Sequence, residues 1–147
     1  MKLSTRTRYG MRALVDLVLN HSDQPIQLKD VAERQQISLS YLEHLIIPLI
    51  SAGILKSTRG AHGGINLAKT PKQINLKEIV EILEGPVAPV DCLKDAHDCP
   101  RSEICATKDV WNDLKIAMES VLASTTLQDL ADRQRCKDNK TENMYYI

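Results

Sequence analysis

Three cysteines lie close together in one acidic stretch of the chain: Cys92, Cys99 and Cys105, spaced Cys-x6-Cys-x5-Cys. These spacings are too wide for the Cys-x2-Cys hairpin of a zinc knuckle, but they keep three thiols within one loop. Thiolates are soft ligands that favour iron–sulfur clusters, zinc or Cu(I) over oxygen-preferring ions. The spacing therefore predicts an iron–sulfur cluster, with structural zinc completed by His97 or Asp98 as the alternative.

The chain has no segment that would send it to a membrane or out of the cell. The apolar run from Ala13 to Leu19 is interrupted by Asp16, so it does not resemble a secretory signal. No stretch approaches the roughly 20 apolar residues of a membrane span. We therefore expect a cytoplasmic protein with no membrane partner, whose clustered cysteines bind metal rather than form disulfides.

The formal net charge of zero hides an uneven distribution of charge. Up to Lys77 there are 11 basic and 5 acidic residues, and from Glu78 onward there are 8 and 14. Four basic residues fall within the first twelve positions, with no acid among them: Lys2, Arg6, Arg8 and Arg12. Such a segment suits contact with DNA phosphates. The scarcity of aromatic residues excludes a stacking platform for single-stranded nucleic acid.

A helix-turn-helix pattern follows this segment. A first helix begins at Ser4 or Thr5, a second covers 28–35, and a third follows the turn at 36–40. A capping box formed by Ser40 and Glu43 is expected to start the third helix. Small and apolar residues have the spacing that locks such a unit together: Val31, Ala32, Ile37, Leu42 and Leu45. This unit would offer the start of its second helix to the major groove, and an ordinary helical hairpin is the alternative.

The next segment predicts a wing. Alternating segments at 54–59 and 65–69 flank the glycine-rich run 60–64, as in a β-hairpin. Arg59 and His62 would lie at its tip, where a cation can enter the minor groove of DNA. The chain has no nucleotide-binding loop, Cys-x-x-Cys motif or convergent acid–base set, so we do not expect an enzyme.

A fourth helix is expected over 75–84, followed by the cysteine loop and a long amphipathic helix. The apolar stripe of that last helix recurs at helical spacing: Val110, Trp111, Leu114, Ala117, Met118, Val121 and Leu122. Few apolar partners remain in the chain, so we expect a second copy to cover the stripe, with burial within one chain as the alternative. The polar segment 136–143 is expected to be mobile before an apolar terminus.

These patterns predict a mainly α protein, a winged helix-turn-helix with a long C-terminal dimerisation helix. Its parts would be a DNA-binding domain at 1–85, a cysteine cluster loop at 86–106, and the dimerisation helix and C-terminal tail at 107–147. Two recognition helices related by a twofold axis would then meet the half-sites of double-stranded DNA.

The chain resembles the IscR/NsrR/CymR group of dimeric winged-helix transcriptional regulators over nearly its whole length. The motifs that carry the resemblance are Met1-Lys2-Leu3-Ser4-Thr5, Arg8-Tyr9-Gly10, Ala32-Glu33-Arg34-Gln35, Ile37-Ser38-Leu39-Ser40-Tyr41-Leu42-Glu43, Arg59-Gly60, Gly63-Gly64 and the three cysteines. The resemblance implies DNA contact by the start of the recognition helix and by the wing, at Ser40, Tyr41, Glu43, His44 and Arg59. The charge pattern adds Lys2 and Arg8 to these expected DNA contacts.

In IscR-like members the three loop cysteines hold an iron–sulfur cluster whose presence alters which DNA sites are bound. Cys92, Cys99 and Cys105 match those positions, and we expect [2Fe–2S] in preference to [4Fe–4S]. The fourth ligand does not carry over, because Lys108 stands where the group has a histidine. The candidates that this leaves are His97, Asp98, Glu103, Asp109, Cys136 and an external thiol or water.

Three other segments resemble the CymR branch, which controls cysteine metabolism: Leu83-Glu84-Gly85-Pro86, Ser124-Thr125-Thr126-Leu127 and Tyr145-Tyr146-Ile147. That branch acts with cysteine synthase, an enzyme that captures peptides ending in isoleucine. Ile147 is therefore a candidate ligand of cysteine synthase, with packing on its own dimer as the alternative. The resemblance implies control of genes for iron–sulfur assembly or for cysteine and sulfur metabolism. A repressor controlled by a partner enzyme, or one stabilised by zinc without a cluster, is the alternative.

Overall fold

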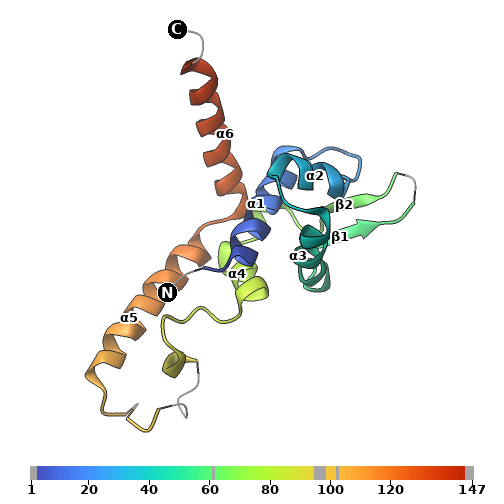
Figure 1. The fold of residues 1–147 in the computed structure, drawn as a ribbon. Helices are drawn as coiled ribbons and strands as arrows, with labels where there is room; N and C mark the ends of the chain where they lie inside the picture. Colours follow the sequence, from blue (N-terminus) through green and yellow to red (C-terminus); the bar gives the residue numbers. More distant parts are fainter. Residues whose placement is uncertain (1–2, 61, 95–98, 102, 145–147) are drawn as a thin grey trace.

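The computed structural model describes residues 3–60, 62–94, 99–101 and 103–144, and a small β-hairpin projects from one side of its helices (Figure 1). The helices are α1 (Thr5–Leu19), α2 (Leu28–Gln35), α3 (Leu39–Ser51), α4 (Leu76–Glu84), α5 (Ala106–Ser124) and α6 (Leu127–Met144), with 3-10 turns η1 (Pro71–Gln73) and η2 (Asp91–Leu93). The strands are β1 (Leu55–Thr58) and β2 (Gly64–Leu67). Residues 3–84 form an N-terminal head, from which α5 and α6 extend in different directions.

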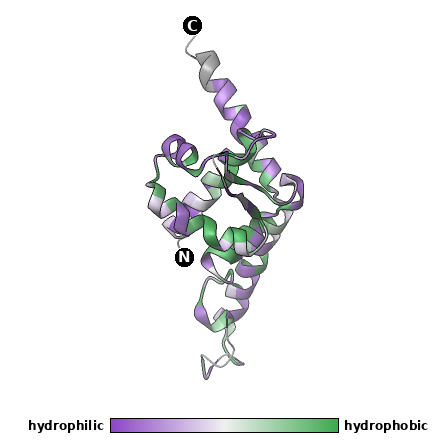
Figure 2. Ribbon diagram, turned by 90° about the vertical axis from the view of Figure 1, so that its right-hand side faces the viewer, coloured by the Kyte–Doolittle hydropathy of each residue, from purple (hydrophilic) through white to green (hydrophobic). Residues whose placement is uncertain are grey.

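Helix α1 is the centre of the head, because it contacts α2, α3, α4 and α6. Its predicted start is confirmed: the Ser4 hydroxyl accepts a hydrogen bond from the backbone N–H of Thr7 at 3.3 Å. Its apolar face is fully buried at Leu14 and Leu17. Figure 2 shows hydrophobic residues on the helices of the head, whereas most of α6 is hydrophilic.

The predicted helix-turn-helix is confirmed in α2 and α3. All five residues of the predicted locking set are buried: Val31, Ala32, Ile37, Leu42 and Leu45. The capping box predicted at Ser40 is wrong, because α3 begins at Leu39 and its cap is Ser38, whose hydroxyl accepts from the N–H of Tyr41 at 3.3 Å. Ser40 and Glu43 are instead exposed on the first turns of the helix.

The predicted wing is also confirmed, as an antiparallel pair in which Leu55 faces Leu67 and Thr58 faces Gly64. The base of the wing is joined to the turn before α2, since Ile26 and Ile65 exchange backbone hydrogen bonds of 3.0 and 2.8 Å. A side chain at Gly64 would place its Cβ 2.4 Å from the carbonyl oxygen of Ile26, so this close approach requires glycine.

Two helices, rather than one helix and a mobile tail, form the C-terminal part. The segment 136–143, which was expected to be mobile, lies within α6. A reciprocal cap starts α6: the Thr126 hydroxyl and the Asp129 carboxylate are hydrogen-bonded at 2.7 Å, and each accepts from the backbone N–H of the other residue. Leu127 and Ala131 are then buried against the head.

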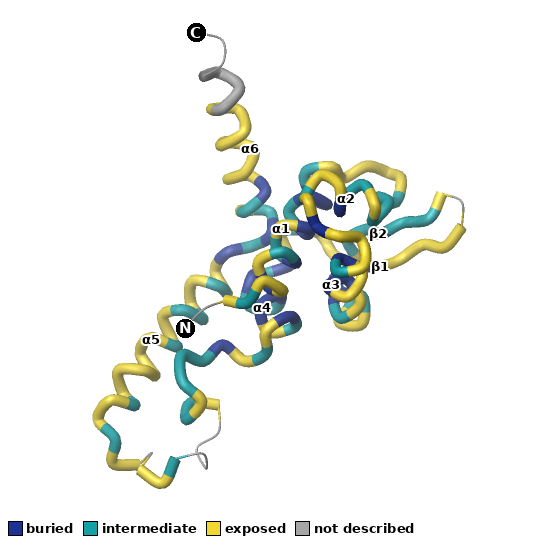
Figure 3. The backbone as a smooth tube through the Cα atoms, in the orientation of Figure 1, coloured by how far each residue is buried: buried dark blue, intermediate teal, exposed yellow. Residues whose placement is uncertain are grey.

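The junction between α5 and α6 is tied to the start of α4 by backbone hydrogen bonds. The N–H of Leu76 donates to the carbonyl of Thr125 at 2.9 Å, and the N–H of Leu127 donates to the carbonyl of Ile74 at 2.8 Å. Beyond this junction the two helices are mostly exposed (Figure 3). None of the helices that the structure describes is long and apolar enough to cross a membrane.

The apolar stripe predicted for α5 is divided between two environments. Leu122 packs against the core of the head, as the alternative of burial within one chain requires. Val110, Leu114 and Val121 are exposed by 61, 42 and 65 %. Most of the stripe, at both ends of α5, therefore remains uncovered in a single chain.

Candidate nucleic-acid interface and cysteine loop

The first turns of α3 present polar side chains on the surface of the head. Ser40, Glu43 and His44 are all exposed there, three and four residues apart on one side of the helix. Because Ser38 caps α3, the carboxylate of Glu43 is not needed as a cap. It is available to accept a hydrogen bond from a base edge such as cytosine N4.

Tyr41 differs from these three residues, because it is half-buried against α1. Its ring meets the ring of Tyr9 edge to face, with centroids 6.2 Å apart and an interplanar angle of 85°. The guanidinium of Arg12 lies over the other ring of this pair, 5.3 Å from the centroid of Tyr9. Tyr41, which was predicted to contact DNA, therefore also joins α3 to α1.

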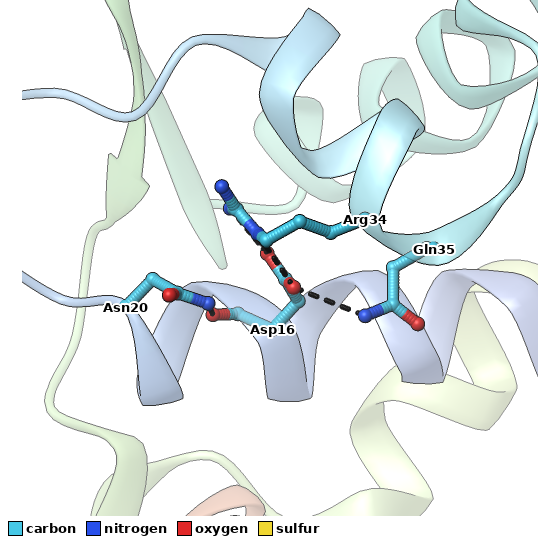
Figure 4. A network of polar contacts seen from close by, with 4 residues as sticks. All are labelled: Asp16, Asn20, Arg34 and Gln35. Carbon is cyan, nitrogen blue, oxygen red and sulfur yellow. Dashed lines mark hydrogen bonds and ion pairs between the residues drawn. The ribbon is translucent and has the colours of Figure 1, made fainter.

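A polar network joins α1 to α2 behind this surface (Figure 4). The carboxylate of Asp16, only 3 % exposed, accepts hydrogen bonds from Arg34 Nε at 3.0 Å and Nη2 at 2.6 Å, and from Gln35 Nε2 at 3.0 Å. The hydrogen bond from Arg34 to Asp16 raises the pKa of the Arg34 side chain. Arg12 adds a second link, since its Nη2 donates to the carbonyl of Gln35 at 2.8 Å. These bonds fix the first helix of the helix-turn-helix on α1.

The wing brings basic side chains beside α3, since β1 packs against that helix. Arg59 and His62 are exposed between β1 and β2, at the tip of the hairpin as predicted. The predicted phosphate contact Arg8 is exposed on α1, as is Arg6, whereas Lys2 lies outside the described residues. The structure thus places exposed polar or basic groups on α1, α3 and the wing of one head.

The three cysteines lie in the loop that connects α4 to α5. Cys92 is in η2, Cys105 is the residue before α5, and all three thiols are half-buried and free. The hydroxyl of Thr107 lies 3.1 Å from Cys105 Sγ, and it lowers the pKa of this thiol together with the backbone N–H groups at the start of α5. Cys105 therefore has hydrogen-bond donors beside its sulfur that stabilise the thiolate relative to that of an isolated cysteine.

The chemistry of these donors fits an iron–sulfur cluster, since three soft ligands share one loop and nearby hydrogen-bond donors lower the pKa of one of them. Within the described ranges, no three His, Cys, Asp or Glu side chains come together as a metal site. His97 and Asp98, two candidates for the fourth ligand, lie outside those ranges. Cys136 is on α6, which runs away from the loop (Figure 1), so it cannot complete a site within the same chain.

Comparison with known proteins gives one consistent result. The profile of the Rrf2 family, described as an iron-dependent transcriptional regulator, matches residues 3–133. The chain is 44% identical over 140 residues to protein rrf2 of Nitratidesulfovibrio vulgaris strain Hildenborough, covering 95% of this chain and 93% of the relative. It is 41% identical over 131 residues to the transcriptional regulator CymR of Bacillus subtilis, covering 89% and 90%.

Solved structures agree with these relatives. The structure of CymR, the global cysteine regulator of B. subtilis, is 39% identical with a TM-score of 0.77, covering 90% of this chain and 98% of that one. The structure of IscR from T. potens is 39% identical with a TM-score of 0.74, covering 91% and 88%. The predicted mainly α winged-helix fold is confirmed by this similarity together with the observed elements.

Proposed function

Because this chain belongs to the Rrf2 family of transcriptional regulators, we propose that it binds operator DNA through α3 and the wing under the control of an iron–sulfur cluster. The chain is a DNA-binding regulator and not an enzyme, in agreement with its relatives. The cluster would be held by Cys92, Cys99 and Cys105, and [2Fe–2S] is the form that we favour. The genes under control would serve iron–sulfur assembly or cysteine and sulfur metabolism.

The observation that supports the DNA interface is the exposed start of α3 beside the wing. Ser40, Glu43 and His44 face outward from a helix that Leu42 and Leu45 fix in the core. Such a helix can enter a major groove without unfolding any part of the head. A wing beside it can reach the neighbouring minor groove or the DNA backbone.

Two substitutions separate the roles of the wing and the helix. Arg59→Ala should weaken binding to all DNA sequences and reduce the slope of log K against log salt by about one unit, since one phosphate or groove contact is lost. Glu43→Ala should instead change the preference among base pairs, by about 1–3 kcal/mol at one position. A fluorescence anisotropy titration against a panel of operator variants measures both effects.

The control for these variants is Lys140→Ala, which removes a basic side chain from α6, away from α3 and the wing. Its affinity should match that of the wild type. A sequence-independent loss in Glu43→Ala together with a changed preference in Arg59→Ala would reverse both assignments.

The cluster is tested by visible absorption with iron and acid-labile sulfide assays on protein purified without oxygen. Cys92→Ser, Cys99→Ser and Cys105→Ser should each lower the cluster content, because each removes one thiolate ligand. Cys136→Ser is the matched control and should keep it. A colourless wild-type protein that contains zinc and reconstitutes no cluster would leave the zinc-stabilised repressor in its place.

The similarity to CymR supports a second candidate function, a repressor controlled by a partner enzyme. We infer for this case that the C-terminal Ile147, which lies outside the described residues, enters the active site of cysteine synthase. Calorimetric titration with that enzyme should then show binding that is lost when Ile147 is deleted. Equal binding with and without this residue would contradict the terminal docking, and no heat with either chain would contradict the partnership.

A further inference from the structure

The first turns of α1 dock on the last turn of α4 through one narrow face. The carboxylate of Glu84 accepts hydrogen bonds from the backbone N–H of Ser4 at 3.2 Å, from the Ser4 hydroxyl at 2.5 Å, and from the hydroxyl of Thr7. Ser4 and Thr7 are three residues apart, so they share the side of α1 that faces α4. Thr7 is only 2 % exposed, whereas Glu84 is exposed, so the contact lies at the edge of the buried core.

The next residue on the same face of α1 is Gly10, and it is in contact with Leu83. A Cβ at position 10 would lie 2.5 Å from Leu83 Cδ1. Three successive positions on one face of α1 are therefore fixed by two consecutive residues of α4. We call this contact, formed by Ser4, Thr7, Gly10, Leu83 and Glu84, the α1–α4 seam.

Glu84 also supplies a charge that α1 itself lacks. The N-terminal turn of a helix favours a nearby anion, because the free N–H groups and the helix dipole are positive there. The first turn of α1 contains no acidic residue, whereas Arg6 and Arg8 are exposed close by. The carboxylate from α4 stands in for the missing acid, and it binds the same Ser4 hydroxyl that caps the helix.

We propose that Glu84 is a positioning residue, which fixes the first turn of α1 on α4 and thereby keeps the exposed Arg6 and Arg8, on the two flanks of that turn, within reach of the DNA backbone. This inference rests on the proposed DNA-binding function. It adds a link to the cysteine loop, because Gly85, with a φ of 94°, follows Glu84 at once and begins the connection to Cys92. A change in the loop would then reach the basic turn of α1 through the α1–α4 seam.

The sign of the effect on DNA binding distinguishes this role from simple electrostatics. Removing an acid near DNA strengthens binding if only its charge matters, because repulsion from the phosphates is lost. Glu84→Ala should instead weaken operator binding about fivefold to tenfold, as expected for loss of about one well-formed interaction. The slope of log K against log salt should fall by up to about two units, since each phosphate contact contributes about 0.9.

The matched control is Glu81→Ala, on the same helix and one turn earlier. Glu81 pairs with Lys77 at 3.7 Å and not with α1, so its removal should leave operator binding unchanged or slightly stronger. Thr7→Val is a second test that keeps every charge and should weaken binding in the same direction as Glu84→Ala. If circular dichroism shows that Glu84→Ala does not fold, Thr7→Val still tests the inference.

A double-mutant cycle shows whether Glu84 acts through the two arginines. In an Arg6→Ala/Arg8→Ala background, Glu84→Ala should cause no further loss of affinity. Wild-type affinity in folded Glu84→Ala and Thr7→Val, or an equal further loss in the background without the arginines, would overturn the inference. Failure of the wild-type chain to bind any operator would refute the proposed function itself, so the two failures are distinguishable.

Discussion

Gln35 occupies a position where helix-turn-helix units usually carry an apolar residue, and in this protein its polar groups form hydrogen bonds to α1. Its amide donates to the buried Asp16, and its backbone carbonyl accepts from Arg12. The next residue, Gln36, adopts a left-handed conformation with a φ of 54°, where glycine is usual. Both departures from the usual pattern are therefore accommodated by local structure, and the unit keeps its packing.

The exposure and the contacts of individual site residues could be predicted from the sequence only in part. The exposure of His44 and the burial of Leu45 follow from helical spacing, which the sequence contains. The contact of Tyr41 with Tyr9 could not be predicted, because it depends on how two separate helices cross. The three hydrogen bonds of Glu84 join residues about 80 positions apart, and no local pattern indicates them.

Glu84 should make the stability of the protein depend on pH in a defined direction. The hydroxyls of Ser4 and Thr7 hold the pKa of this carboxyl below its ordinary value of 4.5. A carboxyl whose pKa is lower in the folded state stabilises the fold fully above the ordinary value, and this contribution is lost as the pH falls through the folded pKa. Glu84→Gln should therefore be less stable than the wild type at pH 7, but by less than about 1 kcal/mol, because solvent screens this exposed carboxylate.

Urea unfolding at a series of pH values measures this difference. The gap in the free energy of unfolding between the wild type and Glu84→Gln should be constant near neutral pH and should shrink only in acid below 4.5. A gap that is the same at every pH, or that widens in acid, would contradict the assignment.

At the level of elements, the sequence predicts α2 with both of its ends and the two strands of the wing closely, because strong local signals mark them. The helix pattern of α2 begins at Leu28, and the glycines at 60–64 separate the strands. The start of α3 was misplaced by a competing pattern, since Ser38 and Ser40 are both good caps and only packing of Ile37 and Leu42 decides between them.

Helix α6 was missed for a different reason. Its starting signal, Thr126 followed by Asp129, is present in the sequence and forms the cap in the structure. Among the residues of α6 whose burial is described, only the first turns bury apolar side chains, at Leu127 and Ala131, and the polar sequence that follows contains no hydrophobic stripe to reveal the helix.

The crossing of α1 and α4 should be sensitive to a single methyl group at Gly10. In an exposed helix Gly→Ala stabilises by about 1 kcal/mol through helix propensity. Here the new Cβ would lie 2.5 Å from a side chain that is 3 % exposed, so Leu83 or the helix must move. We expect Gly10→Ala to lower the free energy of unfolding by about 1–2 kcal/mol, because overpacking outweighs propensity.

Urea unfolding of a compensating pair tests the cause of this loss. In the double variant Gly10→Ala/Leu83→Val, the shorter side chain makes room for the methyl group, so the combined loss should be smaller than the sum of the two single losses. Strict additivity would show that Leu83 is not the obstacle.

At the level of the whole molecule, the uncovered face of α5 is the feature that a single chain leaves unexplained. Val110, Leu114 and Val121 recur at helical spacing and are exposed, and a second copy would bury them around a twofold axis. Val110→Asp/Val121→Asp should therefore shift the chain from dimer to monomer in sedimentation velocity. Affinity for a two-half-site operator should then fall by at least about tenfold, because the two heads no longer bind together.

Ile116 offers a matched control for this experiment. It is 56 % exposed on the same helix, but it lies off the stripe formed by Val110, Leu114 and Val121. Ile116→Asp should keep the dimer and the operator affinity. Dimers that survive the double substitution, or that are lost equally in the control, would show that another surface joins the two copies.

The junction between α5 and α6 has a mechanical consequence for the cysteine loop. Backbone hydrogen bonds hold the end of α5 beside the start of α4, at Thr125 and Leu76, while the loop connects the other ends of the same two helices. The two helices are thus pinned together at one end and connected through the loop at the other, so the span of the loop limits the angle between them. A ligand that draws the two ends of the loop together would narrow this angle. In a dimer joined through α5, the narrowing would change the distance between the two copies of α3, which converts the span of a few residues into the spacing of two half-sites on DNA.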